Sequence, residues 1–184
     1  LKEILKAGEA VVLDTRNFEA FGGAHIPGSY SIDIGGNFAT FAGWIIPPEK
    51  DIYLVCVDEY KAEEALVWLR RVGLDIVPGY LEGGIYSWMM SGAETSHVAQ
   101  VSPDELNSIS TGEDSINIID VRAKTEFEAY HINGAVNIPV HELRTRYKEL
   151  DSSIPTLTIC GSGHRSSLGA SLLKQRGFDD VLNV

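Results

Sequence analysis

The feature that most constrains the fold is an internal repeat whose period is more than half of the 184-residue chain. The stretch Val12–Arg16 (VLDTR) matches Ile118–Arg122 (IIDVR), an offset of 106 residues from position 12 to position 118. Further along, Cys56 aligns with Cys160, an offset of 104 residues from position 56 to position 160. Solenoid repeats have periods of about 20 to 50 residues, so this longer period is that of a duplicated domain. The sequence therefore predicts two homologous domains in tandem.

The boundary between the two domains is expected in the polar stretch 91–97, which shows no hydrophobic periodicity. Just after it, 102–105 (SPDE) is typical of a helix start, with an N-cap serine, a proline at the first helical position and acids in the first turn. We expect one domain at 1–92 and the other at 98–184.

Each domain alternates short apolar runs with helical patterns. Ala62, Ala65, Leu66 and Leu69 recur at the spacing of one helix face. The apolar runs predict strands at Ala10–Leu13, Tyr30–Ile32, Ile52–Val57 and, more weakly, Ile76–Val77, and then at Ile116–Ile119, Val136–Ile138, Leu157–Ile159 and Val181–Leu182. Strands interleaved with helices predict the α/β class, with a mostly parallel central sheet flanked by helices in each domain. Ligands of such sheets bind beyond the carboxyl ends of the strands. The three tryptophans, at 44, 68 and 88, are expected in the core.

The charge balance excludes several kinds of partner. With 15 Lys and Arg against 26 Asp and Glu, the formal net charge is -11. Binding to nucleic acid or to an anionic membrane surface needs clustered basic residues, so we expect neither. No apolar run reaches the roughly 20 residues that cross a bilayer, and no N-terminal pattern points to secretion, so we expect no secretory leader. Two cysteines do not make a disulfide scaffold, and we expect a cytoplasmic location.

The most informative segment follows the third strand of the second domain. It reads CGSGHRSS over 160–167, so that a thiol stands at a strand end and a helix begins near Arg165. Gly161 and Gly163 are expected to let the backbone turn tightly and aim its N–H groups at one point. The positive helix end and the Arg165 guanidinium add to this anion cradle, so the pKa of Cys160 should lie below the free value of about 8.5. These features indicate a nucleophilic cysteine rather than a buried packing residue.

Other polar residues have a structural alternative. In one interpretation, His164 contacts the bound anion or alters the pKa of the Cys160 thiol. In the other, it occupies a variable loop position without a catalytic role. Asp120, Arg122 and His131 recur in the first domain, which favours a strand-end ion pair and a histidine that fixes a loop. We expect no metal and no cofactor, because the five histidines show no metal-ligand spacing.

The loop resembles the active-site loop of the rhodaneses, the thiosulfate and related sulfurtransferases, which runs Cys-x-x-Gly-x-Arg-Ser. The resemblance covers nearly all of 102–184 and, more loosely, 1–91, and it includes Asp120–Arg122, Glu126–Phe127, His131–Ala135 and Asn137–Pro139. It implies two tandem rhodanese-like domains and a Cys160 that takes a sulfane sulfur as a persulfide and passes it to a thiol or to cyanide. Thiosulfate or a low-molecular-weight persulfide is the implied donor. The residues that the resemblance implies for holding this anion are Gly161, Ser162, Gly163, His164, Arg165 and Ser166.

Two rival functions stay open at this point. Phosphatases and arsenate reductases use the same thiolate chemistry, but related phosphatases place five residues between the cysteine and the arginine. Only four residues separate Cys160 from Arg165, which favours sulfur over phosphate. The other rival is a persulfide carrier or regulatory module that hands sulfur only to a fused or docked partner.

The first domain is expected to be a non-catalytic copy. Cys56 is in register with Cys160 and Lys61 with Arg165, but Val57 and Glu59 replace the two glycines, and neighbouring acids repel a thiolate. A relay role for Cys56 is the alternative. The second repeat stops at Val184, before any counterpart of the Gly83–Trp88 segment, so we expect a truncated C-terminus. The arrangement is similar to fusion proteins in which a metal-dependent metallo-β-lactamase-fold domain precedes the rhodanese repeats.

Overall fold

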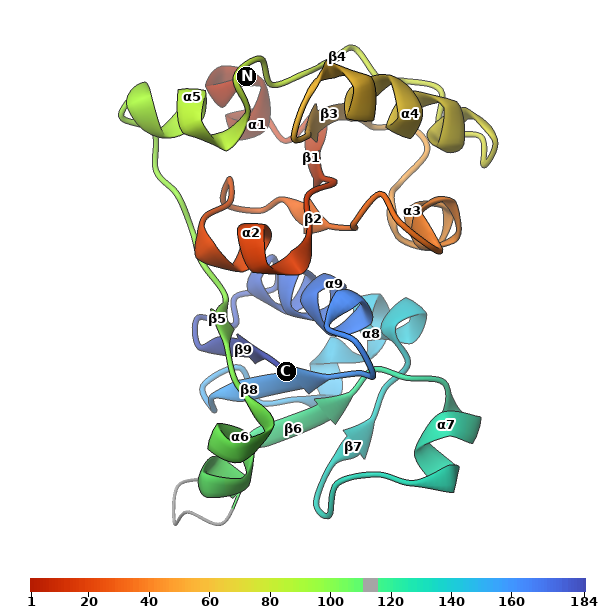
Figure 1. Ribbon diagram of the computed structural model, residues 1–184, viewed down its shortest axis with the longest axis vertical. Coiled ribbons are helices and arrows are strands. Elements are labelled where there is room, and N and C mark those ends of the chain that lie inside the picture. The colour runs from red at the N-terminus through yellow and green to blue at the C-terminus, as the bar shows by residue number, and fades with distance from the viewer. Residues whose placement is uncertain (111–115) are drawn as a thin grey trace. The chain divides into compact units, whose positions relative to one another are not determined.

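The structure follows the repeat: each half of the chain builds its own parallel sheet. The computed structural model describes residues 1–110 and 116–184, and divides into two units, Leu1–His97 and Val98–Val184 (Figure 1). The segment 93–97 belongs to the first unit, because Ser96 and His25 exchange two backbone hydrogen bonds of 2.9 Å. Within the described residues, no helix combines the length and the apolar character that a bilayer crossing requires.

The first unit contains a sheet in the order β2-β1-β3-β4, with every neighbouring pair parallel. Its strands are β1 (Ala10–Asp14), β2 (Tyr30–Ser31), β3 (Asp51–Val55) and β4 (Gly79–Tyr80). Its helices are α1 (Lys2–Lys6), α2 (Phe18–Gly23), α3 (Phe38–Ile45), α4 (Glu59–Arg70) and α5 (Gly84–Met90). The face of α4 that the periodicity predicted is buried at Ala62, Ala65 and Leu69.

The second unit contains a parallel sheet in the order β5-β9-β8-β6-β7. Its strands are β5 (Ala99–Gln100), β6 (Asn117–Asp120), β7 (Val136–Asn137), β8 (Thr156–Ile159) and β9 (Val181–Asn183). Its helices are α6 (Pro103–Ser110), α7 (Lys124–Ala129), α8 (Val140–Arg146), the 3₁₀ helix η1 (Tyr147–Glu149) and α9 (His164–Lys174). In Figure 1, α8 and α9 cover one face of this sheet and α6 lies on the other. The α/β class with two parallel sheets is therefore confirmed.

The helix start expected at Ser102 is present, and its geometry explains why the chain turns there. Ser102 Oγ accepts a hydrogen bond from the backbone N–H of Glu105 at 3.3 Å. In return, the Glu105 carboxylate accepts from the Ser102 backbone N–H at 2.8 Å. These two bonds form a capping box, which satisfies N–H groups that the first turn of a helix leaves without partners.

Equivalent positions of the two repeats are buried alike. Leu13 in β1 and Ile119 in β6 are buried, and so are Ile32 after β2 and Ile138 after β7. Each such side chain contributes about 1.5–3 kcal/mol to stability when it is removed from water. The sequence repeat is thus a repeat of two hydrophobic cores.

Two expectations about local structure are wrong, and one strand was not predicted. Residues Ile76–Val77 form no strand; the fourth strand of the first unit is Gly79–Tyr80, where regular pairing with β3 begins, although the Ile52 N–H of β3 already donates to the Ile76 carbonyl at 2.8 Å. Strand β5 was not predicted, since two exposed residues carry no alternation to recognise. Of the three tryptophans, only Trp88 is in the core; Trp44 and Trp68 are 46% and 37% exposed on α3 and α4.

A buried ion pair lies at the end of β1 in the first unit and of β6 in the second. Arg16 Nε and Nη2 donate to the two carboxylate oxygens of Asp14 at 2.9 and 2.6 Å. Arg122 donates in the same way to Asp120, at 3.0 and 2.6 Å. Each Nη2 also donates to the carbonyl eight residues further on, at 2.7 Å. The pair thereby ties the strand end to the segment that follows the next helix.

Asp120→Asn should lower the free energy of unfolding by about 3 kcal/mol, because it leaves the buried Arg122 guanidinium without its counter-charge. Urea unfolding followed by far-UV circular dichroism measures the change. Glu128→Gln removes an exposed partner of Lys124 and should leave the transition where it is. An Asp120→Asn protein that unfolds at the wild-type urea concentration would contradict this role of the pair.

Candidate functional site

The candidate nucleophile lies immediately after a central strand. β8 ends at Ile159, Cys160 follows, and α9 begins at His164, so that the four residues 160–163 turn the chain from sheet to helix. Because β8 pairs with β9 on one side and β6 on the other, Cys160 lies in the middle of the carboxyl edge of the sheet. This is the position at which open parallel sheets bind ligands.

The sulfur of Cys160 is surrounded by hydrogen-bond donors. Ser166 Oγ lies 3.2 Å from Sγ, and the backbone N–H groups of Ser162, Gly163 and Ser166 also donate toward it. Burial is the largest single influence and raises the pKa of this thiol. The hydrogen bonds act in the opposite direction and together outweigh burial, so the pKa of Cys160 is lowered from its ordinary value. The site thus stabilises a thiolate, the reactive form of cysteine.

The two loop glycines have different roles. Gly163 has φ +82° and ψ -21°, a left-handed conformation that a side chain disfavours by roughly 1–2 kcal/mol. At Gly161 the backbone is not left-handed, and an added Cβ would meet open space. The expectation that both glycines are needed for the turn is therefore wrong for Gly161.

The Arg165 guanidinium is bound to a carboxylate. Its Nη1 and Nη2 donate to the two carboxylate oxygens of Glu126 on α7, at 2.6 and 2.9 Å. The Arg165 guanidinium holds the pKa of Glu126 at about 2, while the backbone N–H of Ala123 donates to the same carboxylate at 3.0 Å. Glu126 is thus a site residue to which the sequence analysis gave no role. Its one signal was its place in the Glu126–Phe127 motif.

Ser162 and His164 lie on the exposed side of the loop. Ser162 Oγ is 3.1 Å from His164 Nδ1. The structure therefore places Gly163, Ser166 and the backbone N–H of Ser162 around the Cys160 sulfur. The side chains of Ser162 and His164 pair with each other instead.

The residues that recur in both units make structural contacts. His131 stacks on Phe127 with ring centroids 4.0 Å apart, and its Nδ1 lies 2.9 Å from the Phe127 carbonyl oxygen. His25 makes the same two contacts with Phe21. Both histidines thus fix the loop that follows α7 or α2, as the structural interpretation predicted. In the described part of the chain, no three His, Cys, Asp or Glu side chains are grouped to hold a metal ion.

Cys56 has the same place in the first unit but a different environment. It is buried, and Thr15 Oγ1 donates to its sulfur at 3.2 Å. Burial, followed by the nearby charges of Asp14 and Asp58, raises the pKa of this thiol despite the Thr15 bond. Asp58 caps α4 by accepting a hydrogen bond from the Lys61 N–H at 2.8 Å. This helix begins at Glu59, three residues after Cys56, whereas α9 begins four residues after Cys160.

Comparisons with known proteins agree with this geometry. A family model described as "Rhodanese-like domain" matches residues 1–91 and 102–184. The chain is 30% identical over 133 residues to the "Putative sulfur carrier protein YrkF" of Bacillus subtilis (strain 168), covering 69% of this chain and 72% of that protein. It is 29% identical over 89 residues to the thiosulfate sulfurtransferase GlpE of Pseudomonas putida, covering 48% and 80%.

Among solved structures, the crystal structure of a thiosulfate sulfurtransferase from Pseudomonas aeruginosa matches 98% of this chain, with 21% identity and a TM-score of 0.42. The match covers 41% of that protein, so the present chain spans about two fifths of its length.

Substitution of the two glycines separates their roles. Gly163→Ala should slow the alkylation of Cys160 by iodoacetamide about tenfold, because the strained loop no longer aims its N–H groups at the sulfur. Gly161→Ala is the matched control and should react like the wild type. Equal rates for the two variants would show that the left-handed residue does not shape the cradle.

The pH dependence of alkylation tests the thiolate directly. The rate follows the thiolate fraction, so the midpoint for Cys160 should lie below the value of a free cysteine, about 8.5. Ser166→Ala removes a hydroxyl contact that lowers the pKa of Cys160 and should move the midpoint upward. Cys56 should stay unmodified until the protein is unfolded. The lowered pKa would be refuted by a wild-type midpoint at or above that of a free cysteine, about 8.5.

Proposed function

Because the chain belongs to the rhodanese family and carries two rhodanese-like domains, we propose that it is a sulfurtransferase that moves sulfane sulfur through a persulfide on Cys160. The observation that carries the proposal is the thiolate-stabilising loop after β8. A nucleophilic sulfur at the open edge of a sheet, held by backbone N–H groups, suits attack on a sulfur atom and stabilises the persulfide anion that results.

The reaction has two steps. With thiosulfate as donor, the Cys160 thiolate attacks the outer sulfur, the S–S bond of the donor breaks, and sulfite leaves with the electron pair. The product is a Cys160 persulfide anion. With a low-molecular-weight persulfide as donor, the same attack releases the donor's thiolate. In the second step an acceptor thiolate or cyanide attacks the outer sulfur of the persulfide, and Cys160 leaves as a thiolate.

The one basic side chain of the cradle, Arg165, is paired with a carboxylate, and this affects how the anionic donor can be bound. The charge of Arg165 is paired with that of Glu126, so the loop meets an incoming anion chiefly through its N–H groups. The negative charge of the whole chain also gives no long-range attraction for anions. Capture of the donor therefore depends on short-range hydrogen bonds at the loop.

The first unit takes no sulfur in this proposal. The Cys56 thiol is buried with a raised pKa, and no loop of N–H groups faces it among the contacts described for that sulfur. Both cysteines are free thiols, which suits the reducing environment of the cytoplasm.

A second candidate is a sulfur carrier that loads Cys160 but passes the sulfur only to a protein partner. The similarity to a protein with a sulfur-carrier name favours it. The two candidates share the loading step and differ in whether small acceptors regenerate the thiol.

Loading and turnover are measured separately. After incubation with thiosulfate, intact-mass analysis should show one added sulfur, and thiocyanate should form when cyanide is supplied. Cys160→Ser should abolish both, while Cys56→Ser, the matched control, should keep at least about half of each. Loading without turnover would establish the carrier. Full activity of Cys160→Ser would overturn the assignment of the nucleophile, and absence of loading with either donor class would overturn the sulfur chemistry.

A further inference from the structure

The outer face of α4 presents apolar side chains to solvent. Val67, in the middle of the helix, is 50% exposed, and Tyr60, in its first turn, is 72% exposed. The two are seven residues apart, so they lie on the same side of the helix. The opposite side of α4 is buried, at Ala62, Ala65 and Leu69. Single exposed apolar side chains are common, so what distinguishes this face is the charge around Val67.

Two unpaired charges flank Val67 on this face. Glu63 precedes it by about one helical turn, and Arg70 follows it by nearly one turn. In the described part of the chain, neither side chain makes an ion pair. Each therefore keeps its charge available for a group from outside the chain.

The other charged side chains beside this face are engaged within the chain. Glu64 accepts a hydrogen bond from Lys61 Nζ at 2.7 Å. The Arg71 guanidinium lies over the Trp68 ring, 4.3 Å from its centroid. Neither Glu64 nor Arg71 is needed for the contact considered below.

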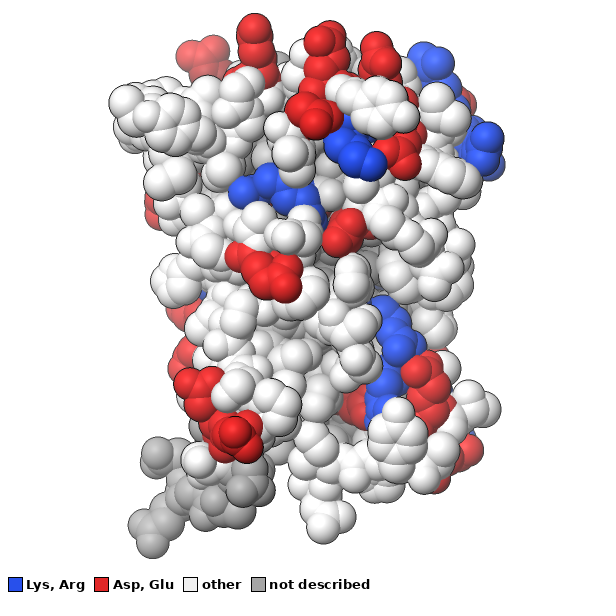
Figure 2. Space-filling model, in the orientation of Figure 1, with Lys and Arg blue, Asp and Glu red and all other residues white. Residues whose placement is uncertain are grey.

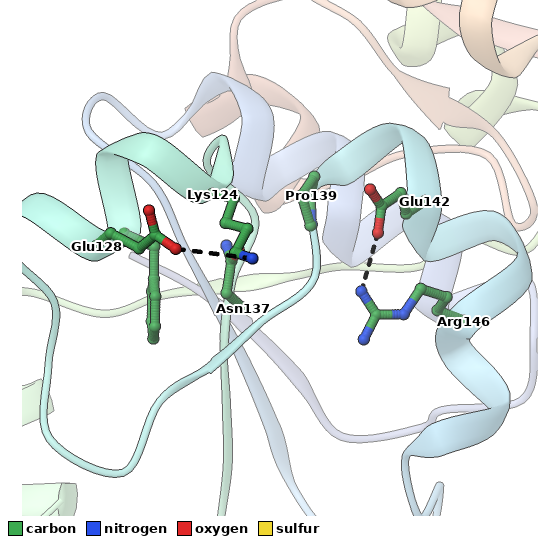
Figure 3. A pocket seen from close by; sticks show the side chains of 7 residues that line it. Lys124, Glu128, Asn137, Pro139, Glu142 and Arg146 are labelled. Carbon is green, nitrogen blue, oxygen red and sulfur yellow. Dashed lines mark hydrogen bonds and ion pairs between the residues drawn. The ribbon is translucent and has the colours of Figure 1, made fainter.

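The pocket between α7 and α8 shows the contrast (Figure 3). Lys124 Nζ lies 3.7 Å from a carboxylate oxygen of Glu128. Arg146 donates to Glu142 at 2.9 Å and to the two carboxylate oxygens of Glu149 at 2.7 and 2.8 Å. The basic side chains that line this pocket are thus already held by carboxylates, unlike the two charges on α4.

The face of α4 is complementary to a second copy of itself. When two identical helices pack antiparallel about a common midpoint, residues before the midpoint of one helix lie next to residues after the midpoint of the other. With Val67 at the midpoint, Glu63 lies beside Arg70 of the partner subunit, and Arg70 lies beside the partner subunit's Glu63. Because the two residues are seven positions apart, they lie on the same side of the helix and both pairs form at once. A two-fold contact of this kind joins the same patch on both copies.

The charges along α4 favour the antiparallel direction. Figure 2 shows acidic side chains over the beginning of α4 and basic ones at its far end. The acids are Glu59, Glu63 and Glu64, and the bases are Arg70 and the C-cap residue Arg71. A parallel pair of helices would bring like charges together at both ends, whereas an antiparallel pair brings opposite charges and opposite helix dipoles together. The formal net charge of -11 gives no general attraction between copies, so association depends on this register.

We propose that this chain forms a two-fold dimer through α4, packed antiparallel with Val67 of each copy at the axis. The inference is independent of the proposed sulfur chemistry, since neither Cys160 nor its loop takes part. α4 has 12 residues and is about 18 Å long, so the contact is short. Exposed ion pairs contribute little each. The dimer is therefore weak, and its fraction rises with protein concentration.

Charge reversal tests the pairing by sedimentation equilibrium. The mass of the wild-type protein should rise with concentration from the monomer value of 20.1 kDa toward that of a dimer. Glu63→Arg and Arg70→Glu should each raise the dissociation constant about tenfold, because each turns both ion pairs into repulsions. An equimolar mixture of the two variants should recover the wild-type value, since opposite charges then meet again in both pairs. Glu49→Arg, in the turn before β3, is the matched control and should associate like the wild type.

The outcomes are distinct. A wild-type mass that stays at the monomer value at every concentration would overturn the inference. So would single variants that dissociate no more than Glu49→Arg, or a mixture that stays as weak as the single variants. Recovery in the mixture also excludes misfolding as the cause of the weaker association.

A cysteine at the two-fold axis tests the register. In a Cys56→Ser/Cys160→Ser background, Val67→Cys places one thiol of each copy next to the other. Oxidation with copper phenanthroline should then give a disulfide-linked dimer on a non-reducing gel. Glu49→Cys in the same background is the control and should stay monomeric. A Val67→Cys protein that crosslinks no faster than Glu49→Cys would contradict the arrangement about Val67.

Discussion

The chemistry of this protein depends on a competition at one sulfur atom. Burial at the end of β8 disfavours the charged form of Cys160, and four hydrogen-bond donors from three residues of the following turn reverse that effect. The donors converge because Gly163 adopts a left-handed conformation that starts α9 at the right place. A single backbone conformation therefore decides whether a buried cysteine is inert or nucleophilic.

The first unit shows the same strand end without that turn. Cys56 follows β3 as Cys160 follows β8, yet its pKa is shifted in the opposite direction. The cause is local: α4 begins earlier relative to the cysteine, capped by an aspartate whose charge opposes a thiolate. The fold alone thus does not make a reactive thiol, since both units share the fold and differ in the loop.

The Glu126–Arg165 ion pair joins the cradle to α7. It also removes the net charge that a lone guanidinium would bring to the thiol. A cradle that is balanced in this way relies on directional hydrogen bonds.

The sequence by itself determined the duplication, the α/β class with parallel sheets and the place of the candidate nucleophile. These follow from patterns that are local in the chain: apolar runs, a repeat of identical residues, and a cysteine followed by Gly163 and Arg165. Only the tertiary structure shows that Arg165 pairs with Glu126 and that Gly161 has room for a Cβ atom. It also decided that Trp44 and Trp68 are exposed. It also brought α7 and α8 together around one pocket. Such features depend on which segments meet in space, and residues 39 positions apart, such as Glu126 and Arg165, leave no periodic signal in the sequence.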